Sequence, residues 1–253
     1  MKEAVGCGCF PTGRHWPGIA HLLRVQARGT VPGLDPDAAW MDLPIAMLDT
    51  ETTGRDPERD RIVEIGIVVG RAGQVIRREN WLVNPGIPIP AEASEVHGIR
   101  DEDVKDQKTF AEIAFEVAKA LEGTVPAAYN ASFDRAFVVS EIARSGLVVE
   151  ALPSCLRPGI DWLDPLVWAR EVQKYEKGKK LGEVAARLGV ALENAHRASD
   201  DAEAALRVLY AFAEDTRLPR IYGAFVQEQR RLARTQEDDF RVWRSKLPVP
   251  GKA

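Results

Sequence analysis

The order of the predicted secondary structure indicates an α/β fold, with a mixed β-sheet flanked by helices. Three consecutive apolar segments, Pro44–Asp49, Arg61–Gly70 and Gln74–Val83, predict a meander of three strands. The elements predicted after them alternate between strand and helix, and this change implies a mixed sheet covered by helices. The chain has 253 residues, 45% of them hydrophobic, so it can form one large α/β domain with extensions or two small domains.

The middle of the chain supplies the next elements in order. Pro85–Pro90 contains three prolines and is expected to be an irregular loop. Thr109–Leu121 has the apolar spacing of a helix, and Val125–Tyr129 predicts a short strand. We expect a further helix from Phe133 to about Ser145, because the glycine that follows is a typical helix end.

One strand and three helices complete the predicted domain. Ile160–Leu163 can form a strand, and Pro165 suits the first turn of the helix after it. Leu181–Leu188 predicts a short helix and Asp200–Glu214 a longer one.

The chain is expected to consist of an N-terminal extension (1–42), a central domain (43–215) and a C-terminal amphipathic helical extension (216–253). Residues 1–42 are rich in Gly, Pro, Arg and Trp and have no sustained periodicity. The C-terminal part has one face with helical three-and-four spacing, formed by Leu218, Ile221, Tyr222, Phe225, Gln229 and Leu232.

Composition and cysteine usage indicate a protein of the cytoplasm. No apolar run approaches the roughly 18 residues of a membrane-spanning helix, and the N-terminus lacks the apolar core of a signal peptide. The cysteines are Cys7, Cys9 and Cys155, an uneven set that argues against a disulfide framework. Cys7 and Cys9 with His15 and His21 match no usual zinc spacing, so a loosely packed N-terminal arm is favoured over a zinc site.

Asp49 and Glu51 lie two residues apart at the end of a predicted strand. The period-two geometry of a strand puts both carboxylates on one face, and Gly54 permits a tight turn that exposes them. The alternative is an ordinary strand end with two surface acids.

Asp134 and Asp201 are each expected in the first turn of a helix. Ser132 suits the N-cap position before Asp134, and Asp200 with Glu203 resembles a capping box at the start of the later helix. The helix dipole favours acids in a first turn, so each aspartate has the alternative of serving its own helix alone.

His196 precedes Asp201 by five residues, which is about 140° around a helix, so the two would not share a helical face. If the helix starts near Asp200, His196 lies in the preceding loop and can reach a site that Asp201 enters from the first turn. A loop histidine without a role is the alternative.

Four acids that converge on one site repel each other and raise each other's pKa values unless cations lie between them. Oxygen ligands suit Mg²⁺ or Mn²⁺, and two such ions beside a phosphodiester, with a histidine near them, form a phosphoryl-hydrolysing site. The net charge of −4, which two divalent ions would bring to zero, argues against a protein that grips long duplex DNA by many phosphates. It fits an enzyme that binds a few terminal nucleotides.

Together these segments resemble the motifs of the DnaQ-like exonucleases, also called the DEDD family, in its histidine subtype. Leu48–Gly54 closely resembles the first motif of bacterial polymerase proofreading subunits. The other segments that resemble the family are Tyr129–Asp134, His196–Ala202, Val96–Ile99, Asp101–Val104 and Lys180–Leu181. The resemblance covers roughly residues 43 to 214 and implies a ribonuclease-H-like sheet.

The resemblance also implies a role for each residue of the site. Asp49, Glu51 and Asp201 would hold two Mg²⁺ or Mn²⁺ ions directly, and Asp134 would complete the site. His196 would be the general base, since an imidazole can take a proton from water at cellular pH. The residues implied around the terminal nucleotide are Thr50, Thr52, Thr53, His97, Asn130 and Phe133.

Three features leave alternatives open. Phe133 can stack on a base or pack in the core. Glu64, inside an apolar strand, either supports the site or faces a solvated edge. A basic loop before the histidine motif is either only solvated or contacts a phosphate, and its residues are Lys174, Lys177, Lys179 and Lys180.

We interpret the chain as a metal-dependent 3′→5′ exonuclease that releases nucleoside 5′-monophosphates from a single-stranded or frayed 3′ end, with DNA favoured. The alternatives are an exoribonuclease similar to RNase T or oligoribonuclease, and a non-catalytic polymerase accessory or binding subunit. The presence of all five site residues argues against the last of these. The C-terminal segment can dock on a polymerase, on a second copy of the chain or on the N-terminal arm, with packing inside the chain as the default.

Overall fold

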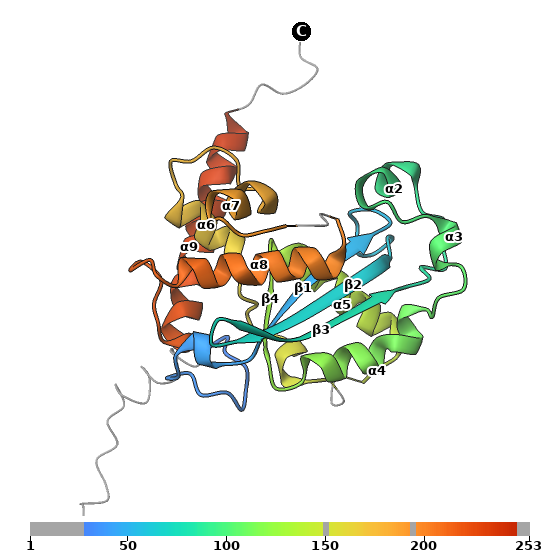
Figure 1. Cartoon of the computed structure of the whole chain (residues 1–253), viewed down its shortest axis with the longest axis horizontal. Coiled ribbons are helices and arrows are strands. Elements are labelled where there is room, and N and C mark those ends of the chain that lie inside the picture. The colour runs from blue at the N-terminus through green and yellow to red at the C-terminus, as the bar shows by residue number, and fades with distance from the viewer. Residues whose placement is uncertain (1–27, 149–151, 193–195, 247–253) are drawn as a thin grey trace, which may run out of the picture.

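The computed structural model describes residues 28–148, 152–192 and 196–246, and these residues form an α/β fold (Figure 1). Its centre is a sheet of four strands in the order β3-β2-β1-β4. The strands are β1 Ile45–Thr52, β2 Ile62–Arg71, β3 Gln74–Leu82 and β4 Val125–Ala128. The first three pair antiparallel and β4 pairs parallel with β1, which confirms the predicted meander and the mixed sheet.

Helices cover both faces of this sheet (Figure 1). On one face α8 (Ala198–Phe212) lies along β1 and β2, and α4 (Phe110–Leu121) and α5 (Ala131–Ser145) cover the other face. The remaining helices are α2 Ala91–His97, α3 Asp101–Val104, α6 Pro165–Val172, α7 Leu181–Arg187 and α9 Tyr222–Ser245, with short 3₁₀ turns at Trp40–Asp42 and Ser154–Leu156. Helices α6 and α7 pack against α8, α6 also packs against α9, and α2 lies beyond the end of β1.

Strand β1 divides the core into two layers because its successive side chains point to opposite faces. Ile45 and Met47 join the cluster beneath α8, whereas Ala46 and Leu48 join the cluster beneath α4 and α5. A strand with both faces covered needs apolar residues at nearly every position. In β1 this run of buried apolar residues extends from Ile45 to Leu48, and the acidic segment begins directly after it, at Asp49.

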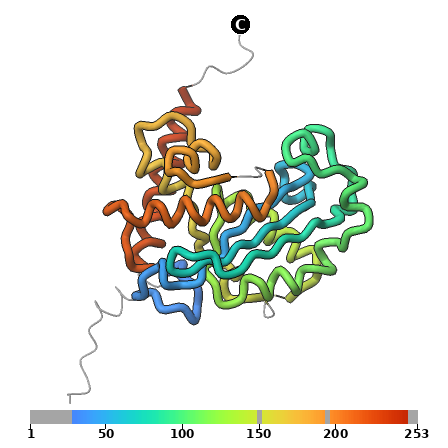
Figure 2. The backbone as a smooth tube through the Cα atoms, in the orientation of Figure 1, coloured from blue at the N-terminus to red at the C-terminus, as the bar shows by residue number. Residues whose placement is uncertain are grey.

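The described part of the N-terminal segment packs against the start of α9, and Figure 2 shows these two segments side by side. Ala39 forms a β-bridge with Ile221, and the ring of Trp40 lies 5.2 Å from that of Phe225. Both aromatic rings are buried in the cluster beneath α8. The predicted domain limits at residues 43 and 215 stay a prediction, although both extensions contribute to one core.

The N-cap predicted for α5 is wrong. The helix begins at Ala131, and its N-cap is Asn130, which has a left-handed backbone, rather than Ser132. The carboxylate of Asp164 accepts the N–H of Asn130 at 3.0 Å and that of Ala131 at 3.1 Å. The partner that caps the helix thus comes from a distant segment, which local sequence does not reveal.

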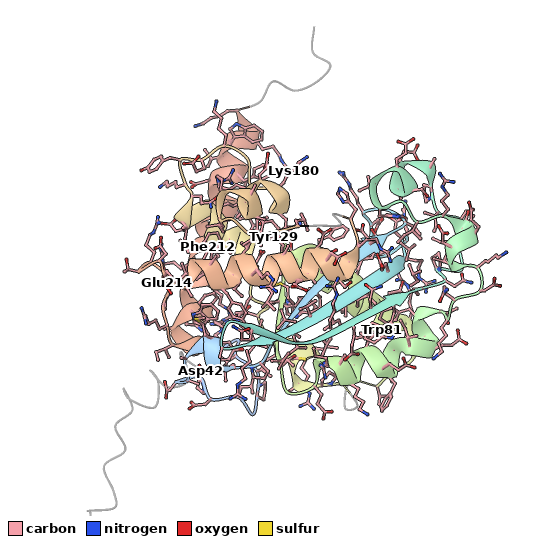
Figure 3. The ribbon with its side chains drawn as sticks, viewed as in Figure 1. Asp42, Trp81, Tyr129, Lys180, Phe212 and Glu214 are labelled. Atoms are coloured by element: carbon pink, nitrogen blue, oxygen red, sulfur yellow. The ribbon has the colours of Figure 1, made fainter. Side chains whose placement is uncertain are left out.

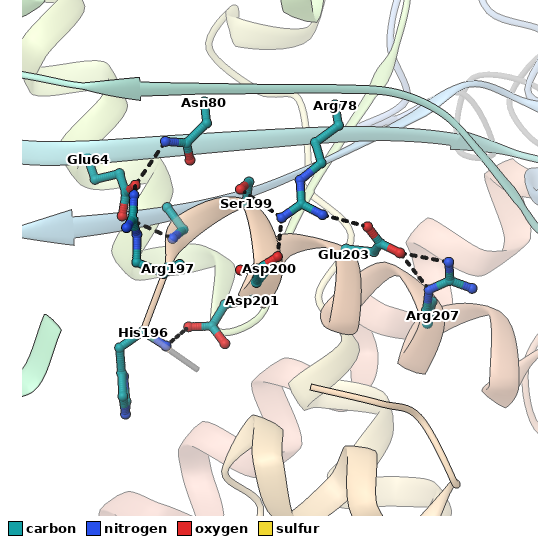
Figure 4. Close-up of polar contacts among 11 residues, drawn as sticks. Glu64, Arg78, Asn80, His196, Arg197, Ser199, Asp200, Asp201, Glu203 and Arg207 are labelled. Atoms are coloured by element: carbon teal, nitrogen blue, oxygen red, sulfur yellow. Dashed lines mark hydrogen bonds and ion pairs between the residues drawn. The ribbon is translucent and has the colours of Figure 1, made fainter. Parts of the chain in front are cut away.

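The start predicted for α8 is also wrong, since the helix begins at Ala198 and Asp200 lies inside it. The expected capping box of Asp200 and Glu203 does not form. Both carboxylates instead pair with Arg78 of β3, Glu203 at 3.0 Å (Figure 4). A long-range ion pair has replaced the local bond.

Two smaller differences concern the loops. Ile160–Leu163 forms no strand, and only Leu163 makes an isolated bridge, to Ala127. The proline-rich loop is followed by the short helices α2 and α3. The apolar periodicity did not predict them, because neither is long enough to show a helical repeat. None of the described helices is long and apolar enough to span a membrane.

Candidate metal centre and nucleotide pocket

The sheet side of the site consists of acids on β1 and at the start of α5. Asp49 and Glu51 lie on β1, both partly buried, and Glu51 pairs across the sheet with Glu64. Asp134 is buried in the first turn of α5, and its carboxylate accepts the hydroxyl of Thr50 at 2.8 Å. Strand geometry and one hydrogen bond therefore bring three acids from two elements together.

The α8 side of the site consists of Asp201 and His196. The backbone N–H of His196 donates to the Asp201 carboxylate at 2.9 Å, and His196 is exposed with a φ of 70° (Figure 4). Ligand atoms of Glu51, His196 and Asp201 all lie within 4.8 Å of one another. The structure thus brings the histidine to the acids, as the sequence predicts, although His196 is not itself helical.

The electrostatics of the site reflect burial first and like charge second. Burial, and after it the charges of Asp134, Glu51 and Asp201, raise the pKa of Asp49 well above its ordinary value. Burial and the charge of Asp201 raise the pKa of Glu51 to about 8. Acids in this state are costly to ionise together, and a bound cation relieves that cost.

Burial also raises the pKa values of the two remaining acids. Burial raises the pKa of Asp134 to about 7, while the hydrogen bond from Thr50 opposes the shift. Burial also raises the pKa of Asp201, and the bond from the His196 backbone opposes it. The ligand atoms of Glu51, Asp201 and His196 thus converge, and the carboxylates of Asp49 and Asp134 lie near enough to interact with them electrostatically. A carboxylate-rich group of this kind fits hard divalent cations such as Mg²⁺ or Mn²⁺.

A cavity of about 460 Å³ lies next to these acids. Five of the six residues predicted around the terminal nucleotide line it: Thr50, Thr52, Thr53, His97 and Phe133. Asn130 does not line it and serves as the N-cap of α5. Phe133 lines the cavity and also packs on Phe137 at 4.9 Å between ring centroids, so its two interpretations are compatible.

His97 is the most distinctive polar group of this cavity. The residue is 6% exposed, and its Nδ1 accepts the N–H of Ile99 at 3.1 Å. Its Nε2 is buried without a hydrogen-bond partner among the described residues. Burial lowers the pKa of His97, so the imidazole that lines the cavity is neutral.

Sequence reasoning missed the other wall of the cavity. It is formed by the turn after β1 and by α2, through Gly54, Arg55, Pro90, Glu92, Ala93 and Val96. The Val-His-Gly phrase was the only local signal for α2. The three prolines ahead of it predicted an irregular loop, so the helix itself was not predicted.

Glu64 does not face a solvated edge, because its side chain is fully buried. It accepts hydrogen bonds from Asn80 and Arg197, both at 2.8 Å.

The basic loop is held close to the β4–α5 junction, since the hydroxyl of Tyr129 donates to the carbonyl of Lys179 at 2.6 Å. Figure 3 shows Tyr129 and the adjacent Lys180 on these neighbouring segments.

The cysteine and histidine group at residues 7, 9, 15 and 21 lies outside the described residues. Cys155 is buried and carries a free thiol. Burial raises the pKa of this thiol to about 12, so it is protonated and unreactive at neutral pH.

A mixed sheet with acids at the end of its central strand, an acid on one flanking helix and a histidine–aspartate pair at the start of another defines a ribonuclease-H-like nuclease. The sequence profile described as Exonuclease (RNase T) matches residues 46–209. The chain belongs to this exonuclease family, which confirms its resemblance to the DnaQ-like enzymes.

Curated relatives include DNA polymerases. DNA polymerase III PolC-type of Thermotoga maritima is 30% identical over 201 residues, which are 78% of this chain and 14% of that protein. The protein of the same name from Streptococcus thermophilus is 32% identical over 169 residues, 67% of this chain and 11% of that protein. The chain therefore spans only a small part of these relatives.

Solved exonucleases share the fold. The zinc-bound complex of Escherichia coli ExoI with single-stranded DNA matches with a TM-score of 0.61 at 20% identity, over 72% of this chain and 42% of that chain. Exonuclease X in complex with 5′ overhanging duplex DNA matches with a TM-score of 0.52 at 24% identity, over 72% of this chain and 99% of that chain. The ribonuclease-H-like fold that the sequence resemblance implied is thus confirmed.

Proposed function

We propose that the protein is a metal-dependent 3′→5′ exonuclease that removes nucleotides from single-stranded or frayed 3′ ends of DNA. The observation that carries this proposal is the convergence of Glu51, Asp201 and His196 within 4.8 Å, beside a cavity of about 460 Å³ that suits one nucleotide. The polymerase relatives and the DNA-bound neighbours support DNA as the substrate.

Asp49, Glu51 and Asp201 would hold two Mg²⁺ or Mn²⁺ ions, and Asp134 would complete the site. Such ions, when bound, supply Lewis acidity to the phosphoryl group and activate water for attack. The chain contributes the positions of the four carboxylates, two from one strand and one from each flanking helix.

His196 would act as the general base that takes the proton of the attacking water. It is exposed, it lies beside Glu51 and Asp201, and its backbone is fixed to Asp201. An imidazole in that place can accept a proton and pass it on to solvent.

The cavity would bind the terminal nucleotide. Thr50, Thr52 and Thr53 form the wall next to the acids, and His97 lines the same cavity. Phe133 supplies an aromatic face for the base. A nucleotide held there places the phosphate that links it to the chain at the carboxylates, which gives the 3′→5′ direction.

The test is digestion of DNA and RNA oligonucleotides of one sequence, labelled at either end, with Mg²⁺ or Mn²⁺. We expect stepwise loss from the 3′ end, release of 5′-monophosphates and a block by a 3′-phosphate, with DNA cut faster than RNA. Cleavage of a circular single strand or release of 3′-monophosphates would refute the proposal. RNA cut faster than DNA would instead favour the exoribonuclease alternative.

We further propose a cytoplasmic location, with a polymerase or a second copy of the chain docking on the distal part of α9. There Phe240, Val242 and Trp243 are each more than half exposed. Sedimentation of the wild type and of Trp243→Ala would decide whether self-association uses this surface.

A further inference from the structure

Glu64 is a buried charge outside the predicted ligand set. Its Oε1 accepts hydrogen bonds from the Asn80 amide at 2.8 Å and from Arg197, Nη2 at 2.8 Å and Nε at 3.2 Å (Figure 4). Its Oε2 accepts the N–H of Ala198 at 3.2 Å. Three of these four bonds come from the two residues that directly follow His196 in the chain. A buried carboxylate is costly unless it is paired, so this pairing indicates a strong constraint on that segment.

Gly66 lies two residues after Glu64, on the same face of β2. A Cβ at Gly66 would lie 2.3 Å from the backbone N of Ser199 and 2.4 Å from the carbonyl carbon of Ala198. Those atoms are backbone and cannot swing aside, so only glycine lets the first turn of α8 rest on the strand. Glu64 and Gly66 together form what we call the α8 seat.

The seat also completes the start of α8. Arg197, the N-cap residue, makes no capping hydrogen bond with its own side chain. The first N–H groups of a helix need partners, and a negative charge is favoured there. Glu64 provides both from the neighbouring strand, 133 residues away in sequence from Arg197.

His196 depends on this arrangement more than Asp201 does. Asp201 is inside α8, whose other face is buried in the core, whereas His196 precedes the helix. Its φ of 70° is unfavourable for a residue with a side chain and persists only where the surroundings impose it. The bonds from Arg197 and Ala198 to Glu64 fix the chain directly after this strained residue.

We propose that Glu64 is a positioning residue for the reaction, which holds His196 in place through Arg197 and touches neither substrate nor metal. This inference rests on the proposed role of His196 as the general base. A merely structural ion pair, a further metal ligand, and a phosphate-binding role of Arg197 are the competing accounts.

Glu141 offers a matched control. It is 1% exposed, it accepts from Arg61 at 2.6 and 2.9 Å and it accepts the N–H of Ile62 at 3.3 Å. Its bonds are thus those of Glu64 in kind, but they lie on the α5 side of the sheet. We expect Glu64→Gln to lower kcat about 10–100-fold, the usual effect of removing a partner that orients an active-site residue, with KM and Mn²⁺ affinity unchanged. Glu141→Gln should keep the wild-type kcat, and thermal unfolding of both variants would show the cost of each pair.

A double-mutant cycle with His196→Ala tests the coupling directly. If Glu64 acts through His196, Glu64→Gln should have no effect on kcat in the His196→Ala background. An equal loss in both backgrounds would overturn the proposal, and so would a weaker Mn²⁺ affinity of Glu64→Gln. Wild-type activity of His196→Ala would overturn the general-base role together with this proposal, whereas a slow His196→Ala beside a fast Glu64→Gln would overturn this proposal alone.

Arg197→Gln tests the same link from its other end, in case Glu64→Gln fails to fold. The Arg197 side chain is 51% exposed, so its substitution opens no cavity in the core, and thermal unfolding measures the cost of leaving Glu64 without its cation. We expect the same loss of kcat at an unchanged KM. A raised KM at an unchanged kcat would make Arg197 a phosphate contact and refute its positioning role.

Discussion

Asp49 and Glu51 belong to β1, which pairs with β2 along its whole length, whereas His196 lies ahead of α8 with an exposed side chain and a left-handed backbone. The acids inherit their positions from the ladder of a buried sheet. The histidine depends on its bond to Asp201 and on the link between its neighbour Arg197 and Glu64. The proposed metal ligands and the proposed general base are therefore held by different parts of the fold, and mutations should separate their effects.

Removal of a charge on the sheet side should have the largest effect. Asp49→Asn and Glu51→Gln keep the shape of each side chain but remove the charge of a proposed metal ligand. We expect single-turnover cleavage at saturating Mg²⁺ to fall about 10⁴-fold or more, since metal ions supply several kcal/mol of stabilisation.

The fold of these variants should be intact, and without metal they should be more stable than the wild type because one repelling charge is gone. Circular dichroism and thermal unfolding in EDTA check this control. A cleavage rate close to that of the wild type in either variant would contradict the metal-site assignment.

His196→Ala should have the next largest effect. We expect it to reduce turnover about 10²–10⁴-fold, the usual contribution of proton transfer by a side chain. Mn²⁺ binding by calorimetry and DNA binding in Ca²⁺ should be retained, because the sheet side is untouched. Equal rates of the variant and the wild type would show that His196 has no role in turnover.

The same comparison explains what could be predicted from sequence. The strands and the positions of Asp49 and Glu51 follow from period-two spacing, which is local. The capping of α5 and α8 was predicted wrongly, because both helices interact with distant segments. Asp164 accepts the first N–H groups of α5, and Arg78 pairs with the two acids that were expected to form the capping box of α8. Local patterns describe an element, but they do not say which distant side chain replaces a local bond.

The support of the site was less predictable than its ligands. Glu64 stood out as an acid in an apolar run, yet its partner Arg197 is 133 residues away. Helix α2, which forms one wall of the cavity, has too few turns for its sequence to show a helical repeat. Asn130 was expected in the pocket because the resemblance to the DnaQ-like exonucleases implied it, but its backbone conformation makes it the N-cap of α5 instead.

Thr50→Val should have a smaller effect that again falls on the sheet side. The Thr50 hydroxyl donates to Asp134 at 2.8 Å and holds the pKa of that carboxyl down against burial. Its loss should favour the protonated acid, so we expect roughly tenfold more Mg²⁺ to be needed for half-maximal activity at pH 7.

Thr52→Val is the matched control for that experiment. Thr52 lines the same cavity, but its hydroxyl donates to the carbonyl of Gly54 at 2.6 Å and has no bond to an acid. Its Mg²⁺ requirement should equal that of the wild type. An equal shift in both variants would mean that the cavity wall, not the hydrogen bond to Asp134, sets the requirement.

The smallest effect we predict concerns the stability of the metal-free protein. The pKa of Glu51 is about 8 in the folded protein and near 4.5 in an unfolded chain, so the folded state keeps a proton that the unfolded state has lost. The resulting stability is complete below about pH 4.5 and is lost as the pH rises through 8. We expect the unfolding temperature in EDTA to fall by at least about 2–4 °C between pH 5 and 8, which corresponds to roughly 1 kcal/mol for a protein of this size. Glu51→Gln removes one of the titrating acids and should weaken this dependence, since Asp49 and Asp134 also have raised pKa values. Mg²⁺ should flatten it in the wild type, whereas His196→Ala should leave the loss of stability with rising pH in place. An unfolding temperature that rises across this range in EDTA would show that the acids are not held together as the structure has them.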